Sequence, residues 1–320
     1  MKAFEGVFAD LLTGFVAFKQ SLSFKYAIEA DELQRFSMFI TKYDLTEPKL
    51  TKELVQAWCK RRPNESLKNN QRRTSTVRQF ALHLNVLGYE AFVMPFEPHT
   101  REYNFTPYIF THSEIERIFE SSDKLYPSRR STMHFVLPVI LRMLYSCGLR
   151  ISEAVALKNK HVNLQEGILE IKNSKFEKDR LIPMSDSMCE MCRHYYRALH
   201  TAATMDDYFF MNKDGTPITR DHVYRRFREV LWESGISHGG IGKGPRVHDL
   251  RHTFAVHTLQ NTVSRQIDPY RSLPILSTYL GHASVKATEQ YLRLTAEVFP
   301  EIRNTLDKTC GYVIPEVPSE

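Results

Sequence analysis

The feature that most limits how this chain can fold is the stretch between Met94 and Pro107, which holds three prolines and shows no apolar periodicity. Proline interrupts helices and cannot donate to a sheet, so an extended linker is expected here. A chain of 320 residues with 42% hydrophobic residues can fill two cores. The sequence therefore predicts a first domain over residues 1–98, a linker over 99–110 and a second domain with a C-terminal tail over 111–320.

The first predicted domain shows helical periodicity and little strand pattern. Apolar residues recur at spacings of three and four, as in Leu33, Phe36 and Ile40. Four helices are expected, and they cover approximately Phe4 to Phe18, Tyr26 to Tyr43, Thr51 to Arg61 and Ser66 to Leu87. A small all-helical domain follows from this pattern.

The second predicted domain is mainly helical with one β-hairpin. Thr111 to Glu114 has the spacing of a capping box and should begin the first helix. The apolar run Met133 to Leu149 is too short and too interrupted to cross a membrane and predicts a core helix. Gly167 to Ile171 and Arg180 to Met184 flank a polar turn and predict the hairpin, and Thr219 to Ser234 predicts a further helix.

The charge and the cysteines indicate a partner class and a compartment. A net charge of +6 favours a polyanionic partner, although enzymes with small anionic substrates are equally basic. Five cysteines and no export signal indicate a reducing compartment, and we expect a cytoplasmic protein of a prokaryote. Cys189 and Cys192 form a C-x-x-C without a second ligand pair, so two buried helix cysteines are favoured over a zinc site.

A basic segment in the first domain is a candidate DNA-contact surface. Long cations interleaved with short hydrogen-bonding side chains suit phosphate and groove contacts, whereas a solvated helix face is the alternative interpretation. Arg225 and Arg226, off the apolar stripe of the helix Thr219 to Ser234, are added as DNA-contact candidates. The candidates in the first domain are Lys60, Arg61, Arg62, Lys68, Arg72, Arg73 and Arg78.

The pair His248 and Arg251 differs from the other two H-x-x-R pairs of the chain in its surroundings. It follows the glycine-rich segment Gly239 to Pro245 and opens an apolar helix. A cationic pair at the start of a buried helix needs an anion, which could be a phosphate or a carboxylate of the protein itself. The pair is therefore a candidate anion site.

The order of motifs resembles that of the tyrosine recombinases, also called the phage integrase family. The resemblance rests on Gly148-Leu149-Arg150-Ile151-Ser152-Glu153, a hairpin lysine, His248-Asp249-Leu250-Arg251-His252-Thr253-Phe254-Ala255, Leu280-Gly281-His282 and Tyr291. It implies a two-domain clamp on DNA, in which a helical core-binding domain precedes an α+β catalytic domain. The implied fold class is mainly α with a small β-hairpin or sheet.

The resemblance also implies roles for individual residues. Tyr291 would be the nucleophile, and it would form a 3′-phosphotyrosyl bond while a 5′-hydroxyl leaves. Arg150 and Arg251 would hold the non-bridging oxygens of the scissile phosphate, and His282 would donate a hydrogen bond to it. Two fixed guanidiniums can neutralise the charge that phosphoryl transfer develops, so neither a metal nor another cofactor is expected.

Three further roles concern proton transfer and orientation. His248 would accept or relay the proton of the tyrosine, and Lys175 would protonate the leaving oxygen. Lys175 is chosen over Lys172 and Lys178 because it stands five residues before Arg180, as in the family. Glu153, one turn beyond Arg150, would orient the basic groups, and an ordinary surface acid is the alternative.

The expected function is site-specific DNA recombination, which could serve integration, excision, resolution or transposition of a mobile element. A type IB topoisomerase and a catalytically silent DNA-binding accessory protein are the alternatives. The resemblance implies a monomer in solution that forms a homotetramer on two DNA sites, with no membrane partner. The apolar pattern of Val298, Phe299, Ile302 and Leu306 would dock on a neighbouring protomer or on its own domain.

Overall fold

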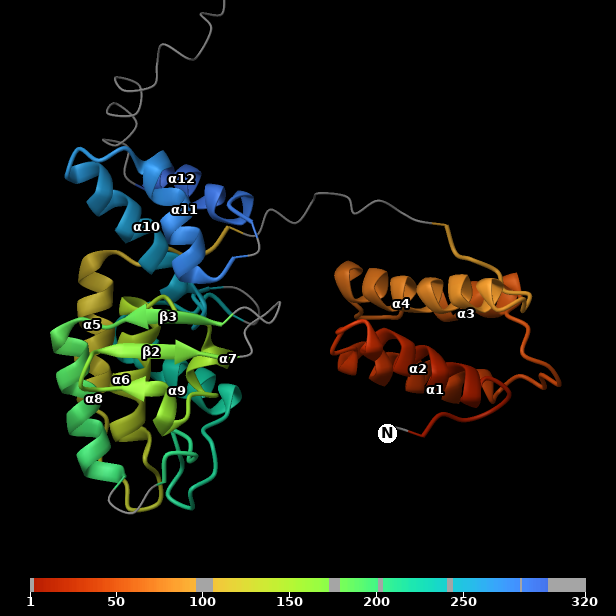
Figure 1. Ribbon diagram of the computed structural model, residues 1–320, viewed down its shortest axis with the longest axis horizontal. Helices are drawn as coiled ribbons and strands as arrows, with labels where there is room; N and C mark the ends of the chain where they lie inside the picture. Colours follow the sequence, from red (N-terminus) through yellow and green to blue (C-terminus); the bar gives the residue numbers. More distant parts are fainter. Residues whose placement is uncertain are drawn as a thin grey trace, which may run out of the picture. The chain divides into compact units, whose positions relative to one another are not determined.

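The chain forms two compact units in a computed structural model that describes residues 3–95, 106–172, 179–200, 204–240, 244–282 and 284–298, with side chains described to residue 295. Contacts between residues divide the chain into residues 1–104 and 105–320. Each unit has its own hydrophobic core (Figure 1). The predicted linker lies mostly outside the described residues, as do Lys175 and the side chains of the C-terminal apolar pattern.

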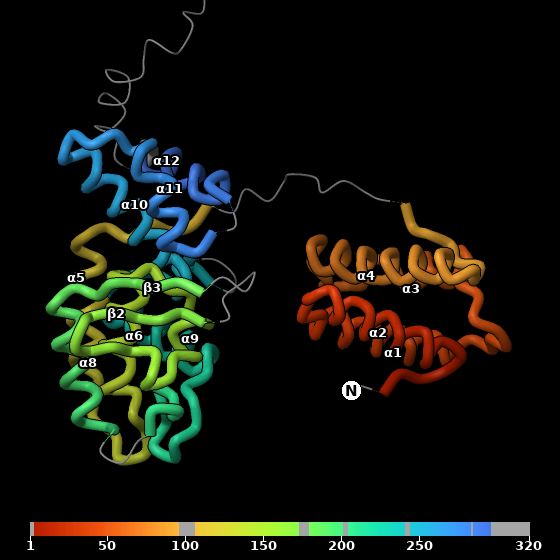
Figure 2. Tube along the Cα trace, viewed as in Figure 1, coloured from red at the N-terminus to blue at the C-terminus, as the bar shows by residue number. Residues whose placement is uncertain are grey.

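The first unit is a bundle of four helices, as the sequence predicts (Figures 1 and 2). The first helix begins at Ala9 rather than at Phe4, because Gly6 takes a left-handed turn with φ of 74°. The longest helix, α4, packs against the other three, and rings such as Phe15, Phe36 and Phe80 fill the space between them. The helices are α1 (Ala9–Ser21), α2 (Ala27–Ile40), α3 (Lys52–Cys59) and α4 (Leu67–Val86).

The second unit is mainly helical and carries a small antiparallel sheet of order β1-β2-β3. The predicted hairpin is confirmed, because β2 pairs with β3 and Leu169 lies opposite Ile182. The strand β1, which is only two residues long, escaped the sequence analysis. The elements are α5 (His112–Asp123), α6 (Met133–Ser146), α7 (Ile151–Ala154), the 3₁₀ helix η1 (Asn159–His161), β1 (Val162–Asn163), β2 (Ile168–Ile171), β3 (Arg180–Pro183), α8 (Asp186–Leu199), α9 (Arg220–Glu233), α10 (Asp249–Ser264), α11 (Pro269–Leu280) and α12 (Lys286–Val298).

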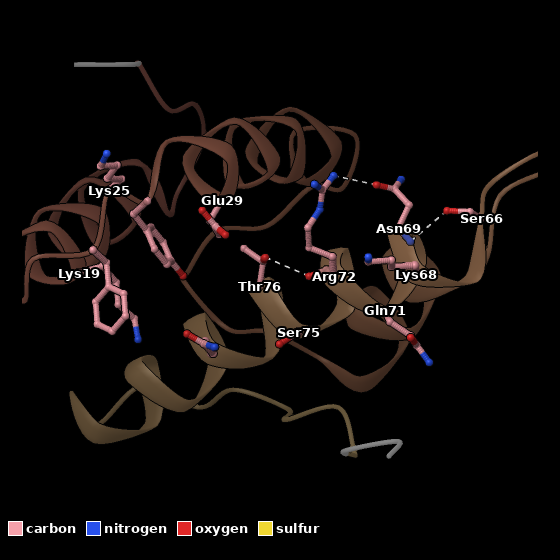
Figure 3. A pocket seen from close by; sticks show the side chains of 13 residues that line it. Lys19, Lys25, Glu29, Ser66, Lys68, Asn69, Gln71, Arg72, Ser75 and Thr76 are labelled. Carbon is pink, nitrogen blue, oxygen red and sulfur yellow. Dashed lines mark hydrogen bonds between the residues drawn. The ribbon is translucent and has the colours of Figure 1, made fainter. Parts of the chain in front are cut away.

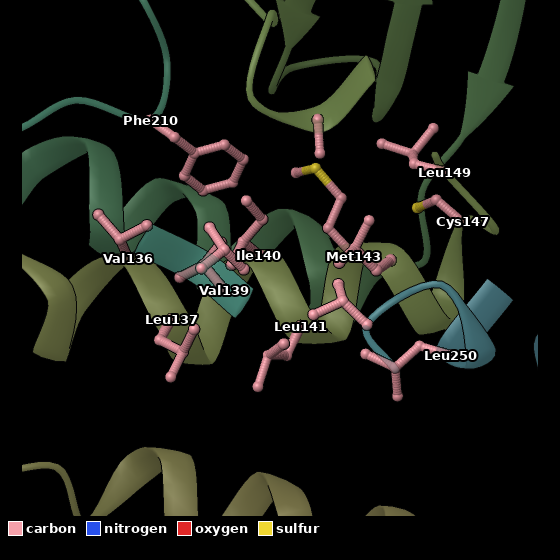
Figure 4. Packing of buried hydrophobic residues seen from close by; sticks show 14 of the residues in the cluster. Val136, Leu137, Val139, Ile140, Leu141, Met143, Cys147, Leu149, Phe210 and Leu250 are labelled. Carbon is pink, nitrogen blue, oxygen red and sulfur yellow. The ribbon is translucent and has the colours of Figure 1, made fainter. Parts of the chain in front are cut away.

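The helix α6 forms the centre of the second unit, which confirms the predicted core helix. It contacts α5, α8, α9 and α10, and side chains such as Val136, Ile140 and Met143 are fully buried (Figure 4). Cys189 and Cys192 on α8 are buried as well, which agrees with their interpretation as core cysteines. In the described part of the chain, no helix is long and apolar enough to span a membrane.

The start of the second unit lies slightly earlier than the sequence analysis placed it. The capping box at Thr111 is present, since its side chain accepts from the N–H of Glu114 and Glu114 accepts from the N–H of Thr111. Phe110, assigned by sequence to the linker, is fully buried, and its N–H donates to Thr253 Oγ1 at 3.1 Å. The chain therefore enters the core before α5 begins.

A smaller core joins the last three helices of the described chain. It contains Ala255, Val256 and Leu259 of α10, Leu273, Leu276 and Leu280 of α11, and Tyr291 and Leu294 of α12. Figure 1 shows these helices side by side, in blue tones, at one end of the second unit. Because α10 also packs on α6, this core fixes α11 and α12 relative to the turn that follows α6.

Candidate active site

Arg150 reaches the candidate site through a tight turn at the end of α6. Gly148 has φ of 58°, and a Cβ atom at this position would lie 2.6 Å from Phe254 Cδ1. Only glycine meets both the left-handed backbone and the close ring at low cost. The turn places Arg150 at the N-cap of α7, one turn before Glu153.

Glu153 binds two arginines and is buried. Its carboxylate accepts from Arg150 Nη1 at 2.7 Å and from Arg180 Nη1 and Nη2 at 3.1 Å and 2.8 Å. Burial alone would raise the pKa of Glu153, but the hydrogen bonds and the charge of Arg180, with those of Arg150, lower the pKa to about 2. The carboxylate is thus ionised, and a surface acid is not its role.

Arg251 is the more buried of the two arginines proposed to hold phosphate. Its guanidinium donates to the carbonyls of Gly148 at 2.7 Å and Leu280 at 2.6 Å, and the residue is 2% exposed. Burial and the nearby charge of Arg150 lower the pKa of Arg251 to about 10, so it stays protonated at neutral pH. Arg150 keeps 20% of its side chain exposed, and its Nη2 donates to Gly281 O at 2.9 Å.

Tyr291 lies in the middle of α12 with its ring buried, 1% exposed. Its hydroxyl lies 2.9 Å from Nδ1 of His252, and its ring stacks against that of His282 at 6.2 Å between centroids. Burial raises the pKa of Tyr291, while the charges of Arg251 and Arg150 act in the opposite direction. The phenol is therefore protonated at neutral pH and is close enough to both arginines to feel their charge.

Three histidines surround the tyrosine and the arginines. His248, at the start of α10, lies against His252 with centroids 4.7 Å apart, and Nδ1 of His282 lies 2.8 Å from Thr288 Oγ1. Burial, His248 and Arg251 lower the pKa of His252 to about 3. Burial and the charge of Arg251 lower the pKa of His248 and of His282 to about 4. All three rings are neutral near pH 7.

The structure brings together residues from distant parts of the chain, namely Arg150, Glu153, Arg251, His282 and Tyr291. His248 contacts His252, which in turn contacts Tyr291. Sequence reasoning gave no role to two residues that contact this site. His252, and not His248, is the partner of the Tyr291 hydroxyl, and Arg180 binds Glu153. Their positions in the sequence could have indicated them, because His252 directly follows Arg251 and Arg180 stands five residues after Lys175. Lys175 lies outside the described residues.

A cavity of about 1000 Å³ opens in the first unit between α4 and the α1–α2 turn (Figure 3). Lys19, Lys25, Lys68 and Arg72 contribute positive charge to it, and Glu29 is its one acidic lining residue. Arg72 is exposed and its Nη2 donates to Asn69 Oδ1 at 2.7 Å. Two of the predicted DNA-contact residues, Lys68 and Arg72, therefore line this cavity.

Arg73 is a correction to the predicted DNA-contact set. It is 1% exposed, and its guanidinium donates to both carboxylate oxygens of Glu65 and to the carbonyls of Trp58 and Lys60. Hydrogen bonds and the charge of Arg73, against opposing burial, lower the pKa of Glu65 to about 2. The prediction is wrong for Arg73, because the residue forms a buried ion pair with Glu65 in the α3–α4 loop and binds α3 through the Trp58 carbonyl.

The other basic candidates lie nearer the surface. Lys60, Arg61 and Arg62 are exposed, although Arg62 also lies over the Trp58 ring at 4.8 Å. Arg78 is half-buried and its Nε donates to Met94 O at 3.0 Å. In the second unit, Arg225 is exposed on α9 and Arg226 binds Glu229. Their roles in DNA contact stay predictions.

Comparisons with known proteins show the family to which the chain belongs. A model of the phage integrase family matches residues 109–297. The putative integrase/recombinase y4rB of Sinorhizobium fredii is 30% identical over 312 residues, which cover 94% of this chain and 97% of that protein. The tyrosine recombinase XerD of Listeria innocua is 28% identical over 193 residues, 59% of each chain.

Two solved structures share the fold. The XerH site-specific recombinase bound to difH substrate, a post-cleavage complex, has a TM-score of 0.63 at 18% identity and covers 85% of this chain and 77% of that one. The Tn1549 transposon integrase in complex with transposon right end DNA has a TM-score of 0.62 at 14% identity and covers 91% and 98%. The chain belongs to the phage integrase family. It is an enzyme of the tyrosine recombinase class.

Proposed function

We propose that this protein is a site-specific DNA recombinase that cleaves and rejoins strands through a 3′-phosphotyrosyl intermediate. The observation that carries the proposal is the position of Tyr291, whose hydroxyl binds a neutral imidazole while Arg150 and Arg251 lie close enough for their charges to act on it. A nucleophile, a proton acceptor and two fixed cations are the groups that phosphodiester exchange requires.

The reaction forms one ester bond as it breaks another. Tyr291 Oη attacks phosphorus and the bond from phosphorus to the 5′-oxygen breaks. The phenolic proton passes to His252, whose Nδ1 lies 2.9 Å from the hydroxyl, and Lys175 supplies a proton to the 5′-oxygen. Because one phosphate ester replaces another, the reverse attack by a 5′-hydroxyl reseals the strand without ATP.

Arg150 and Arg251 neutralise the charge on the non-bridging oxygens, and His282 assists them. We assign His282 Nδ1 as the acceptor of the Thr288 hydroxyl, which leaves Nε2–H to donate to phosphate. Preorganised donors of this kind are each worth about 3 to 4 kcal/mol in the transition state, so loss of either arginine should slow cleavage at least about a hundredfold.

DNA binding involves both units. The exposed cations and amides of the α4 cavity suit phosphate and groove contacts, and Arg225 and Arg226 on α9 add charge in the second unit. Because Tyr291 is buried in the free protein, α12 must shift when DNA binds so that the hydroxyl faces the phosphorus. We further propose a monomer that assembles as a tetramer on two sites and acts on a mobile element. The names of two relatives, both putative integrase/recombinases, support a role in DNA integration or recombination.

The test uses a nicked suicide substrate that contains the recombination site. Wild type should form an adduct that survives denaturant, and Tyr291→Phe should form none. An adduct with the Phe variant would show that the nucleophile is misassigned. The same reaction in EDTA should proceed unchanged, and inhibition that Mg²⁺ restores would contradict the metal-free mechanism.

Two alternatives give different outcomes in this assay. A type IB topoisomerase would relax supercoiled DNA with no demand for a particular site, whereas the proposed recombinase requires one. A silent accessory protein would bind DNA and form no adduct. The assembled catalytic residues favour an active enzyme over the accessory protein.

A further inference from the structure

The C-terminal end of α11 binds three arginines through three consecutive backbone carbonyls. Tyr279 O accepts from Arg180 Nε at 2.9 Å. Leu280 O accepts from Arg251 Nη2 at 2.6 Å, and Gly281 O accepts from Arg150 Nη2 at 2.9 Å. The three side chains come from β3, from α10 and from the turn before α7, so one short backbone segment joins three parts of the fold.

This arrangement has a physical basis in the helix end. The last carbonyls of a helix have no intrahelical partner and carry partial negative charge, so they favour cations. Three guanidiniums that converge on one place repel one another, and the α11 carbonyls and the Glu153 carboxylate offset that repulsion. The same segment continues directly into His282 and then into α12 with Tyr291.

Arg180 differs from the other two arginines in what it binds. It is buried, with 7% of its side chain exposed, and both terminal nitrogens bind Glu153 while Nε binds Tyr279 O. It therefore turns its hydrogen-bonding edge toward the protein. Glu153 in turn binds the N–H of Arg150 at 2.9 Å and its Nη1 at 2.7 Å, so Arg180 acts on Arg150 through Glu153.

Gly281 is required for this arrangement. Its φ is 66°, and a Cβ atom there would lie 2.9 Å from Arg180 Nη1 and 3.1 Å from Cζ. Because three hydrogen bonds hold the guanidinium, it has little freedom to move aside. A side chain at residue 281 would therefore displace Arg180 or the neighbouring carbonyls that bind the three arginines.

We propose that Arg180 is a positioning residue that, together with the α11 carbonyls, fixes Glu153 and Arg150 relative to the segment that carries His282 and Tyr291. The inference rests on the proposed function, since it assigns Arg180 to the same phosphate site. Arg180 does not touch the phosphate, and its effect reaches the reaction through the placement of the Arg150 guanidinium. β3 is thereby tied to the active site.

The experiment compares cleavage of two suicide substrates that carry either the normal phosphate or an uncharged methylphosphonate at the scissile position. Arg180→Ala should slow cleavage of the phosphate about 10- to 100-fold, as loss of an orienting partner does at other preorganised sites. The methylphosphonate lacks the charge that Arg150 neutralises, so its cleavage should slow much less. The ratio of the phosphate rate to the methylphosphonate rate should therefore fall in Arg180→Ala, and it should also fall in Arg150→Ala.

The matched control is Arg142→Ala, which removes an arginine that binds Asp123 with both terminal nitrogens on the α5–α6 side. The control should leave the ratio unchanged. Arg180→Lys keeps the buried charge but not the two parallel bonds and should fall between wild type and Arg180→Ala. Gly281→Ala perturbs the same contact from the other side and should also lower the ratio.

Equal slowing on both substrates, or none, would overturn the positioning role. Absence of a Tyr291-dependent adduct in wild type would instead refute the proposed function, so the two failures are distinguishable. Thermal unfolding of each variant identifies any that fail to fold. If Arg180→Ala does not fold, an unchanged ratio in Arg180→Lys and in Gly281→Ala overturns the inference equally.

Discussion

The hydroxyl of Tyr291 lies 2.9 Å from Nδ1 of His252. Burial raises the pKa of the phenol, and burial with neighbouring basic residues lowers the pKa of the imidazole to about 3, so both groups are neutral near neutral pH. His252, which directly follows Arg251, thus contacts the nucleophile. His248 lies one turn earlier, at the N-cap of α10.

Replacement of His252 tests this contact. We expect His252→Ala to slow adduct formation about a hundredfold, because a positioned general base typically contributes this much. Adduct formation is measured as a first-order rate on the suicide substrate. His194→Ala, on an exposed residue of α8 that binds Glu190, is the control and should react as wild type does. A His252→Ala rate equal to wild type would mean that the tyrosine proton leaves by another route.

Replacement of the adjacent residues Arg72 and Arg73 should affect different properties, DNA binding for Arg72 and stability for Arg73. Arg72→Ala removes an exposed cation of the α4 cavity and should weaken DNA binding and reduce its salt dependence, with little change in stability. Arg73→Ala leaves the buried Glu65 unpaired and should lower the free energy of unfolding by about 3 to 5 kcal/mol.

These effects are measured by DNA titration at several salt concentrations and by urea unfolding. Each variant serves as the control for the other, because they remove the same side chain from neighbouring positions. Equal loss of stability in both variants would contradict the buried ion pair, and a DNA affinity unchanged in Arg72→Ala would exclude this cavity as a contact surface.

Stability should fall as the pH falls below about 6.5. The ordinary pKa of histidine is 6.5, whereas burial and neighbouring positive charge lower it to about 3 for His252 and about 4 for His282. Between these values the unfolded chain binds protons that the folded chain does not, so acid favours unfolding.

The His252→Asn variant lacks one such group. Its free energy of unfolding should fall less steeply with pH than that of wild type, by up to about 1.4 kcal/mol per pH unit within this interval. Urea unfolding at several pH values between 4 and 7 measures the two slopes. Parallel slopes would show that His252 titrates at its ordinary value in the folded protein.

Gly148→Ala should destabilise the second unit through its contact with Phe254 as well as through its backbone. Gly215→Ala provides the control, because Gly215 also has a left-handed φ, of 79°, but no atom lies within 4 Å of its added Cβ. The difference between the two variants isolates the steric cost, which we expect to be about 1 to 3 kcal/mol. Unfolding curves that coincide would show that the ring of Phe254 moves aside freely.

Much of the local structure follows from the sequence because it depends on near neighbours. Thr111 caps its helix as its spacing predicts, and the apolar run that becomes α6 is buried. The hairpin was identified from two apolar segments around a polar turn. By contrast, the first helix begins later than its periodicity indicates, because a turn at Gly6 interrupts the chain.

By itself, the sequence determined the family, the helical character of both units and the types of reactive group, since these depend on residue order and short-range periodicity. The tertiary structure decided which groups meet. His248 and His252 are one turn apart on one helix face, so only the packing of α12 against α10 selects the partner of Tyr291. Arg72 and Arg73 are likewise indistinguishable by type, and only the packing of α3 on α4 buries one and exposes the other.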